Sequence, residues 1–165
     1  IKLSDNENFK LGSLDFKAYL IPGHTSGHIC FYLKSEKIIF TGDTLFSLGC
    51  GRVFEGTHLE MLTSLKLLKK LPIDTQIYCG HEYTQKNLEF CVKYEINNNK
   101  LSEKKKWIIS RISQKQATIP ITIEEELNTN IFLRCDNSEV KKSLGMKNST
   151  ELEVFKKLRD LKDVF

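Results

Sequence analysis

Three short segments of this 165-residue sequence place histidine or aspartate beside glycine, each directly after a stretch that favours a β-strand. The segments are PGHTSGH (22–28), TGDTLF (41–46) and CGHEY (79–83). Glycine lets the backbone turn sharply, so the polar side chains can be presented together from strand ends. Imidazole nitrogens with one carboxylate suit a borderline metal such as zinc. Taken singly, each segment is more typical of a structural or solvated side chain, but the three in this order favour a metal site.

These segments also carry a resemblance to a known family. GHTSGH, FTGDTLF, GCGRVFEGT and YCGHEYT are similar to motifs of glyoxalase II, the hydroxyacylglutathione hydrolases of the metallo-β-lactamase superfamily. The resemblance covers nearly the whole chain. It implies an α+β fold, in which residues 1–95 form the C-terminal part of an αββα sandwich and residues 96–165 form a helical, glutathione-binding domain. It also implies two divalent metals in the complete enzyme, with zinc first and iron or manganese as alternatives.

The resemblance assigns catalytic and metal-binding roles to three residues. His24 corresponds to a ligand of the first metal, Asp43 to the carboxylate that bridges both metals, and His81 to a ligand of the second. His28 matches a position that does not bind metal, and we expect it to satisfy a backbone group instead. His58 lies in the first turn of an expected helix, where we expect a solvated surface residue.

Substrate contacts follow from the same resemblance. Arg52, in GCGRVFEGT, occupies a basic position that contacts glutathione, and Tyr83 matches a glutathione-binding tyrosine. Arg159 and Lys162 match an Arg-x-x-Lys pair that binds glutathione carboxylates; on the residues alone, this i, i+3 pair is a solvated helix face. Phe54 stands where some members have another tyrosine, so no role is carried over to it.

The implied reaction is hydrolysis of an S-2-hydroxyacylglutathione thioester, chiefly S-D-lactoylglutathione, to a 2-hydroxy acid and glutathione. A hydroxide held between the two metals would attack the thioester carbonyl, because metal binding lowers the pKa of water to about 7. The metal would take up the oxyanion charge. Glutathione would leave as a thiolate, and a thiol pKa of about 8.5 makes this departure easy without a strong general acid.

One metal-binding motif of the family, His-x-His-x-Asp-His, is absent from these 165 residues. The histidines present are His24, His28, His58 and His81, and none stands in such a motif. Because three ligands divided over two metals should not hold them tightly, we expect the chain to be an incomplete, inactive portion of the hydrolase. We expect a missing N-terminal half, or a second copy of the chain, to cover the sheet that this half leaves exposed.

Other functions stay open. A glutathione-linked persulfide dioxygenase, an iron enzyme, has a similar Gly-Cys-Gly-Arg stretch but lacks a helical C-terminal domain. A non-catalytic remnant that binds glutathione or a partner would be expected to lose ligand residues, yet His24, Asp43 and His81 are present. A nucleic-acid-processing member of the superfamily carries an extra domain, of which this sequence shows no sign.

Hydrophobic periodicity predicts the strands of the first half of the chain. Residues 14–20 alternate as a strand with one buried face, and residues 28–34 and 37–41 form a hairpin, with a further short strand at 76–80. Without the other half of the sandwich, we expect an open apolar face on this sheet. The residues expected to carry it are Phe16, Ile29, Phe31 and Ile39.

Helices are predicted from capping residues and apolar spacing. Thr57 and Glu60 form a capping box at the start of a helix to about residue 70, and another helix covers 84–94. Beyond the asparagines at 97–99 the chain is predicted to be helical. The helices expected there are 100–115, a short one after Thr122 with Glu125 as its capping partner, one near 138–144, and one from Thr150 with Glu153.

Composition narrows the class of protein. The net charge of +4 is mild, and the lysines at 104–106 beside Trp107 favour a solvated helix face over a nucleic-acid surface. Five cysteines without close pairs favour reduced, partly buried thiols and a cytoplasmic location, with a mitochondrion or another organelle also open. No apolar run reaches the roughly 18 residues that a membrane span needs. We therefore expect neither a nucleic acid nor a membrane as a partner.

Overall fold

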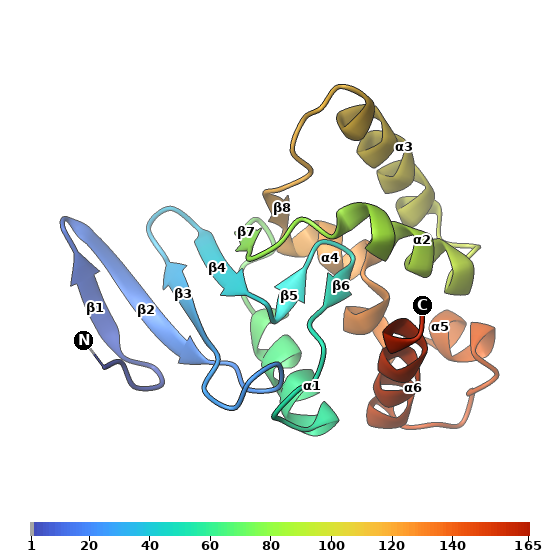
Figure 1. Ribbon diagram of the computed structural model, residues 1–165, viewed down its shortest axis with the longest axis horizontal. Coiled ribbons are helices and arrows are strands. Elements are labelled where there is room, and N and C mark those ends of the chain that lie inside the picture. The colour runs from blue at the N-terminus through green and yellow to red at the C-terminus, as the bar shows by residue number, and fades with distance from the viewer. Residues whose placement is uncertain (1) are drawn as a thin grey trace.

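The computed structural model describes residues 2–165, in which a mixed sheet is combined with helices in the α+β arrangement that the sequence predicts (Figure 1). The strands of the main sheet lie in the order β1-β2-β3-β4-β7-β8, and only β4 and β7 are parallel neighbours. These strands are β1 (Asn8–Leu11), β2 (Leu14–Leu20), β3 (Ile29–Leu33), β4 (Ile38–Gly42), β7 (Gln76–Cys79) and β8 (Ile121–Thr122). A separate hairpin is formed by β5 (Leu45–Phe46) and β6 (Gly49–Cys50).

The helices follow the predicted positions closely. They are α1 (His58–Leu68), α2 (Thr84–Tyr94), α3 (Asn99–Ser113), α4 (Ile123–Thr129), α5 (Ser138–Ser143) and α6 (Glu151–Asp163), with a 3₁₀-helix at Ile131–Arg134. The capping boxes predicted at Thr57, Thr122 and Thr150 are all formed. No helix in the described part of the chain has the length and apolar character needed to cross a membrane.

The connection between β4 and β7 explains the position of α1. Parallel neighbours cannot be joined by a tight turn, so the chain must cross over between them. It does so through the β5–β6 hairpin and α1, whose buried face carries Met61, Leu65 and Leu68. Those side chains belong to the same core as the fully buried Ile39 and Ile77 of the central strands.

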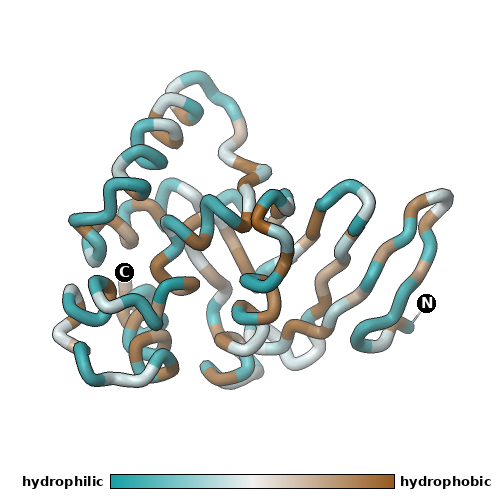
Figure 2. Tube along the Cα trace, turned by 180° about the vertical axis from the view of Figure 1, so that it is seen from behind, coloured by the Kyte–Doolittle hydropathy of each residue, from teal (hydrophilic) through white to brown (hydrophobic). Residues whose placement is uncertain are grey.

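The two faces of the sheet differ in how far they are covered, and the apolar alternation along the strands is visible in Figure 2. Cross-strand pairing puts Tyr32 and Ile39 on one face, with Ile77, and Phe31 and Phe40 on the other. The first face is buried. On the second face Phe40 remains 43% exposed, which confirms that an open apolar face exists.

One prediction about these faces needs correction. Ile39 was expected on the open face, but it pairs with Tyr32, one residue out of phase with Phe40, and is completely buried on the covered face. The apolar face of residues 14–20 belongs to the open face, as expected without the other half of the sandwich, and Leu14 and Leu20 are 41% and 42% exposed there. Phe16, Ile29 and Phe31 do lie on the open face and are partly buried.

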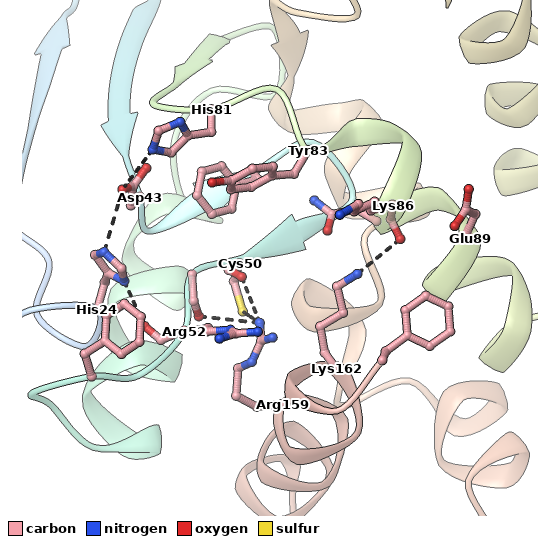
Figure 3. Close-up of a pocket in the computed structure, with 15 residues that line it drawn as sticks. His24, Asp43, Cys50, Arg52, His81, Tyr83, Lys86, Glu89, Arg159 and Lys162 are labelled. Atoms are coloured by element: carbon pink, nitrogen blue, oxygen red, sulfur yellow. Dashed lines mark hydrogen bonds and ion pairs between the residues drawn. The ribbon is translucent and has the colours of Figure 1, made fainter.

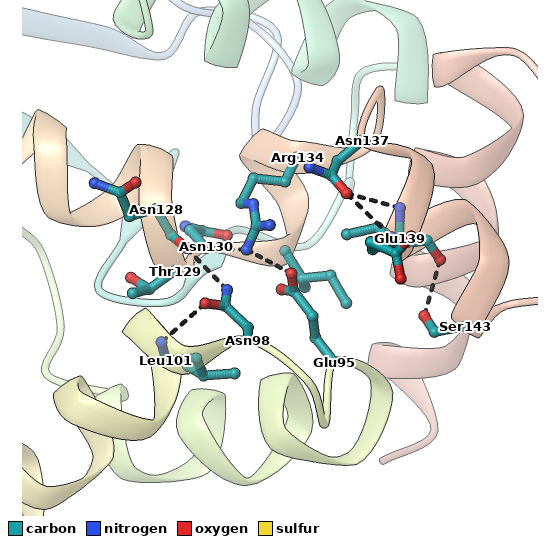
Figure 4. Close-up of polar contacts among 12 residues, drawn as sticks. Glu95, Asn98, Leu101, Asn128, Thr129, Asn130, Arg134, Asn137, Glu139 and Ser143 are labelled. Carbon is teal, nitrogen blue, oxygen red and sulfur yellow. Dashed lines mark hydrogen bonds and ion pairs between the residues drawn. The ribbon is translucent and has the colours of Figure 1, made fainter.

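Buried polar contacts tie the C-terminal helices to one another (Figure 4). Arg134 of the 3₁₀-helix lies 2.5 Å from the carboxylate of Glu95, at the end of α2, and both side chains are largely buried. Asn98 caps α3 by accepting from the Leu101 backbone N–H at 3.1 Å, and its amide donates to the Asn128 carbonyl. These contacts join α2, α3 and the α4 region through side chains rather than through a sheet.

Several elements have no clear signal in the sequence. The strands β1, β5, β6 and β8 and the 3₁₀-helix were not predicted, and the strands among them have two to four residues each. β8 pairs with β7 through Ile121 and Ile77, so residues beyond 95 add a strand to the sheet. The division of the chain after residue 95 stays a prediction.

Two side chains expected in solvent are held in contacts instead. His58 is partly buried, with Nε2 at 3.8 Å from Asp160 of α6. Lys104 is buried, because its ammonium lies 2.6 Å from Glu125 and 4.1 Å from the ring centre of Trp107. The cysteines are all free, as predicted, and four of the five are buried.

Candidate functional site

The three predicted metal ligands meet at one edge of the sheet. β2, β4 and β7 all run in the same direction, so the loops that follow them emerge at the same edge. His24 lies on the loop after β2, Asp43 follows β4 directly, and His81 lies just beyond β7. The glycine-containing turns predicted at these strand ends therefore bring the three side chains together.

Asp43 stands between the two imidazoles (Figure 3). Its Oδ2 lies 3.6 Å from His24 Nε2 and 3.6 Å from His81 Nε2. Its Oδ1 is buried and has no hydrogen-bond partner among the described residues. A carboxylate oxygen left unpaired beside two imidazoles needs a further partner, which a cation would supply.

The tautomer of His24 suits metal binding. His24 Nδ1 lies 2.9 Å from the Arg52 carbonyl, which can only accept, so Nδ1 must carry the proton. Nε2 is then the nitrogen with a free lone pair, and it faces Asp43. An imidazole oriented in this way by a backbone carbonyl is a common arrangement at metal sites.

The donors fit a shared metal site but do not complete one. Asp43 offers a carboxylate whose Oδ2 faces the Nε2 atoms of both His24 and His81. Within residues 2–165, however, no group of three or more His, Cys, Asp or Glu side chains forms a full metal-binding cluster. The chemistry of the three donors suits a metal, while their roles as ligands and the need for further ligands stay predictions.

His28 has the structural role that was expected of it. Its Nε2 accepts a hydrogen bond from the Asp43 backbone N–H at 3.0 Å. Burial lowers the pKa of His28, and the nearby His24 acts in the same direction, so the neutral, accepting form is favoured. Gly42 makes this contact possible, because a Cβ there would lie 2.6 Å from His28 Nε2.

A cavity of about 600 Å³ extends from the predicted metal ligands to the C-terminal helix. All seven predicted site residues line it: His24, Asp43, Arg52, His81, Tyr83, Arg159 and Lys162. The structure thus brings them together, while their individual roles stay predictions. Residues that sequence reasoning missed also line it, among them Phe46, Lys86, Glu89 and Phe165. Phe46 had a signal, since it ends the TGDTLF segment, whereas nothing local marks the other three.

The basic residues of the cavity differ in burial and in how many of their donors are already used in hydrogen bonds. Arg159 is only 3% exposed, and its guanidinium donates to the Cys50 carbonyl at 2.8 Å and to Asp163 at 2.9 and 3.2 Å. Lys162 donates to the Lys86 carbonyl at 3.1 Å, and burial lowers its pKa. The Arg52 side chain is exposed, and its Nε lies 3.5 Å from Asp163 Oδ1. Arg52 and Lys162 are therefore more available to an anion than Arg159.

Comparisons with known proteins divide the chain into two matched parts. Residues 2–81 match the metallo-beta-lactamase superfamily, and residues 82–165 match the family described as hydroxyacylglutathione hydrolase C-terminus. A hydroxyacylglutathione hydrolase of Pelagibacter ubique is 48% identical over the whole chain, which spans 63% of that relative. One of Bartonella tribocorum is 45% identical over 99% of the chain and 64% of the relative. The chain thus spans less than two thirds of the length of these relatives.

Solved structures agree on the fold. ETHE1 from Myxococcus xanthus superposes with a TM-score of 0.60 at 21% identity, over 97% of this chain and 51% of that one. The BLEG-1 B3 metallo-beta-lactamase gives a TM-score of 0.54 at 23% identity, over 79% of this chain and 47% of that one. At these identities the likeness shows the metallo-β-lactamase fold alone.

Proposed function

This chain belongs to the hydroxyacylglutathione hydrolase family, and we propose from this that it forms the glutathione-binding side and part of the metal-binding side of a thioesterase. The substrate would be an S-2-hydroxyacylglutathione, with S-D-lactoylglutathione as the first candidate. The observation that carries the proposal is the position of Asp43, whose Oδ2 lies 3.6 Å from both His24 and His81 in a cavity that also holds Arg52 and Lys162.

In this proposal His24, Asp43 and His81 hold two divalent metals, zinc first and iron or manganese as alternatives. When bound, the metals would supply Lewis-acid activation of water toward the thioester carbonyl. Asp43 would help to hold both metals, since its Oδ2 lies 3.6 Å from each imidazole. The Arg52 carbonyl keeps the His24 lone pair directed at the site.

The rest of the cavity matches the chemistry of glutathione. Glutathione carries two carboxylates, and Arg52 and Lys162 offer cationic donors in the same cavity, with Lys162 farther than Arg52 from His24 (Figure 3). Tyr83 lies beside His81 with its ring at 5.1 Å, so its position suits the part of the substrate near the thioester. Residues 96–165 would form the glutathione-binding domain, although Arg159 would act mainly through the backbone of Cys50.

We further propose that a segment outside these 165 residues supplies the remaining metal ligands and covers the open sheet face. The share of the relatives that the chain spans supports this, and so does the exposure of Phe40, Leu14 and Leu20. A second copy of the chain could cover the face but would bring no His-x-His-x-Asp-His motif. Five free cysteines favour a reducing compartment such as the cytoplasm.

Neither alternative function is favoured by these observations. The match of residues 82–165 to the C-terminal part of the hydrolases argues against a persulfide dioxygenase, which would lack that helical region. A non-catalytic remnant does not need an Asp43 carboxylate with one oxygen, Oδ2, between two imidazoles and the other, Oδ1, buried and unpaired among the described residues.

The test compares the 165-residue chain with a completed enzyme. The completed enzyme joins this chain to the part of the Pelagibacter ubique relative that the chain does not match. We expect S-D-lactoylglutathione hydrolysis from the completed enzyme with zinc and almost none from the chain alone, which should also bind fewer than two metals by elemental analysis. Asp43→Asn in the completed enzyme is the matched control and should abolish turnover.

Either of two results would contradict the proposal. A completed enzyme that folds and binds metal but leaves the thioester intact would refute the assigned reaction. Turnover by the chain alone at the rate of the Pelagibacter ubique relative would refute the need for further ligands.

A further inference from the structure

The turn of the β5–β6 hairpin is unusual in its conformation and its burial. Its two central residues are Ser47 and Leu48, and Leu48 has φ +60°, in the left-handed region that leucine seldom adopts. Both residues are buried, so the polar groups of this backbone need partners inside the protein. Such a turn persists only where its surroundings hold it.

Side chains from the helical region supply those partners. From α2, the Asn87 amide donates to the Ser47 carbonyl at 2.9 Å, and the Cys91 thiol donates to the Leu48 carbonyl at 3.2 Å. From α4, Glu126 Oε2 accepts from the Leu48 backbone N–H at 2.9 Å. The strained residue is thus held on both of its peptide groups.

Asn130 joins Glu126 to the strands of the hairpin. Its Nδ2 lies 2.7 Å from Glu126 Oε2, 3.1 Å from the Gly49 carbonyl and 3.4 Å from the Phe46 carbonyl. Its Oδ1 accepts from the Phe132 backbone N–H at 3.0 Å, which fixes the amide in this orientation. Glu126 and Asn130 are both completely buried.

The hairpin in turn carries part of the cavity wall. The Phe46 ring lies 5.3 Å from the Tyr83 ring and 6.4 Å from the His81 ring. Arg52 follows β6 after one intervening glycine, its carbonyl orients His24, and its side chain lines the cavity. A displacement of the hairpin would therefore move both Phe46 and Arg52.

We propose that Glu126 and Asn130 are positioning residues that hold the β5–β6 hairpin and thereby set the substrate side of the cavity. They do not line the cavity, so they act through Phe46 and Arg52. The consequence for substrate binding rests on the proposed function, whereas the effect on the hairpin does not. Glu126 Oε1 has no hydrogen-bond partner among the described residues. Burial raises the pKa of Glu126 to about 8, so a glutamine is a close substitute for the neutral carboxyl near pH 7.

The experiment uses four variants of the completed enzyme: Glu126→Ala, Asn130→Ala, Glu126→Gln and Val140→Ala. Val140 is completely buried in α5, which makes no hydrogen bond to the hairpin, so its variant reports destabilisation alone. Three quantities are measured: amide hydrogen exchange at Leu48 and Gly51, the Kd for glutathione by calorimetry, and kcat and KM for S-D-lactoylglutathione.

We expect Glu126→Ala and Asn130→Ala to raise KM and the glutathione Kd about tenfold or more, with a smaller change in kcat. Exchange at Leu48 and Gly51 should become faster in both. Glu126→Gln should keep all these values within about threefold of the parent enzyme, because it retains the shape and an acceptor for Leu48 and Asn130. Val140→Ala should lower stability and leave KM, Kd and exchange at Leu48 unchanged.

Unchanged KM and Kd in folded Asn130→Ala, or an equal rise in Val140→Ala, would overturn the proposal. If Glu126→Ala does not fold, Asn130→Ala and Glu126→Gln still decide the matter. If the parent enzyme does not hydrolyse the thioester, the proposed function fails by itself. Hydrogen exchange then tests the positioning role, and an unchanged rate at Leu48 and Gly51 in Asn130→Ala overturns it.

Discussion

At the scale of single residues, short-range contacts decide what each side chain can do. His24 and His28 lie four residues apart, yet only His24 presents a free nitrogen to Asp43, because the Arg52 carbonyl takes its other ring nitrogen. The accepting nitrogen of His28 is used by the Asp43 backbone. Two histidines of one loop thus have different chemistry because they have different hydrogen-bond partners.

The raised pKa of the buried Glu126 carboxyl should make the stability of the protein depend on pH. Burial raises the pKa of Glu126 from 4.5 to about 8, and the nearby Glu125 acts in the same direction. The hydrogen bonds from Asn130 and Leu48 and the charge of Lys104 lower this pKa but do not offset the effect of burial. Between these two values the folded chain holds a proton that the unfolded chain has released. The corresponding stabilisation is therefore complete below about pH 4.5 and is lost as the pH rises to about 8.

Glu126→Gln should remove this dependence, because glutamine stays neutral at every pH. We expect the parent's free energy of unfolding to fall relative to that of the variant by on the order of 3–5 kcal/mol between pH 5 and pH 8. Urea denaturation of both proteins at pH 5, 6.5 and 8 measures the difference. A difference that stays constant over this range would show that Glu126 ionises normally in the folded state.

Arg159 and Lys162 should respond differently to truncation, although both line the cavity. Arg159→Ala removes a buried guanidinium that holds the Cys50 carbonyl and Asp163, so it should cost about 2–4 kcal/mol of stability and also raise KM. Lys162→Ala should raise KM while changing stability by about 1 kcal/mol or less. Thermal unfolding and steady-state kinetics separate the two effects. A loss confined to kcat in either variant would mean that the residue acts on the chemical step.

At the scale of elements, the loops at the sheet edge depend on close backbone approach. A Cβ on Gly51 would lie 2.0 Å from the Asp43 carbonyl oxygen and 3.3 Å from His24 Nδ1. The segment after β6 can therefore run beside both His24 and Asp43 only because it has no side chain at this point. The carbonyl of the next residue, Arg52, then reaches His24.

Gly51→Ala should displace this segment, whereas Gly27→Ala, on the loop of the two histidines, meets no atom within 4 Å. We expect Gly51→Ala to lower the zinc content and the turnover of the completed enzyme at least about tenfold, because His24 and Asp43 would both shift. Gly27→Ala should retain both within about twofold. Elemental analysis and the thioesterase assay provide the measurements, and equal behaviour of the two variants would refute the argument.

At the scale of the whole molecule, one face of the sheet is covered by the chain's own helices and the other is open. Neighbouring residues of β4 show the difference, since Ile39 is completely buried and Phe40 is 43% exposed. Soluble monomers seldom leave a large apolar face open, so we expect another segment or chain to pack on this one. Its position fits the proposal that a segment outside these residues packs there.

Substitutions at these neighbours should separate folding from association. In the 165-residue chain, Ile39→Thr should cost about 2–4 kcal/mol of stability, because it buries a hydroxyl and leaves a cavity. Phe40→Thr should leave stability within about 1 kcal/mol and lower both self-association and binding of a dye specific for apolar surfaces. Light scattering, dye fluorescence and urea denaturation test this. A parent chain that is a dye-negative monomer would show that the open face is covered in another way.

The sequence by itself determined the local features of this protein. Helix positions and the three capping boxes follow from residues a few positions apart in the sequence. The hydrogen bonds of a capping box form within the first turn of its own helix and need no distant segment. The segments around His24, Asp43 and His81 could be identified in the same way, because each is a strand followed by a glycine turn. Their convergence follows from strands that run in one direction.

Only the tertiary structure decided which side chains are buried and by what. Ile39 was assigned to the wrong face because a shift of one residue reverses every side chain of a strand, and the pairing partners lie elsewhere in the sequence. The i, i+3 spacing of Arg159 and Lys162 is typical of a solvated helix face, but α6 packs so that the Arg159 guanidinium donates to the Cys50 carbonyl. Glu126 and the turn at Leu48 are 78 residues apart in the sequence, so no local pattern could show that one holds the other. Burial and hydrogen bonding between distant segments are properties of the packed structure, and these contacts fix the positions of the residues around the cavity.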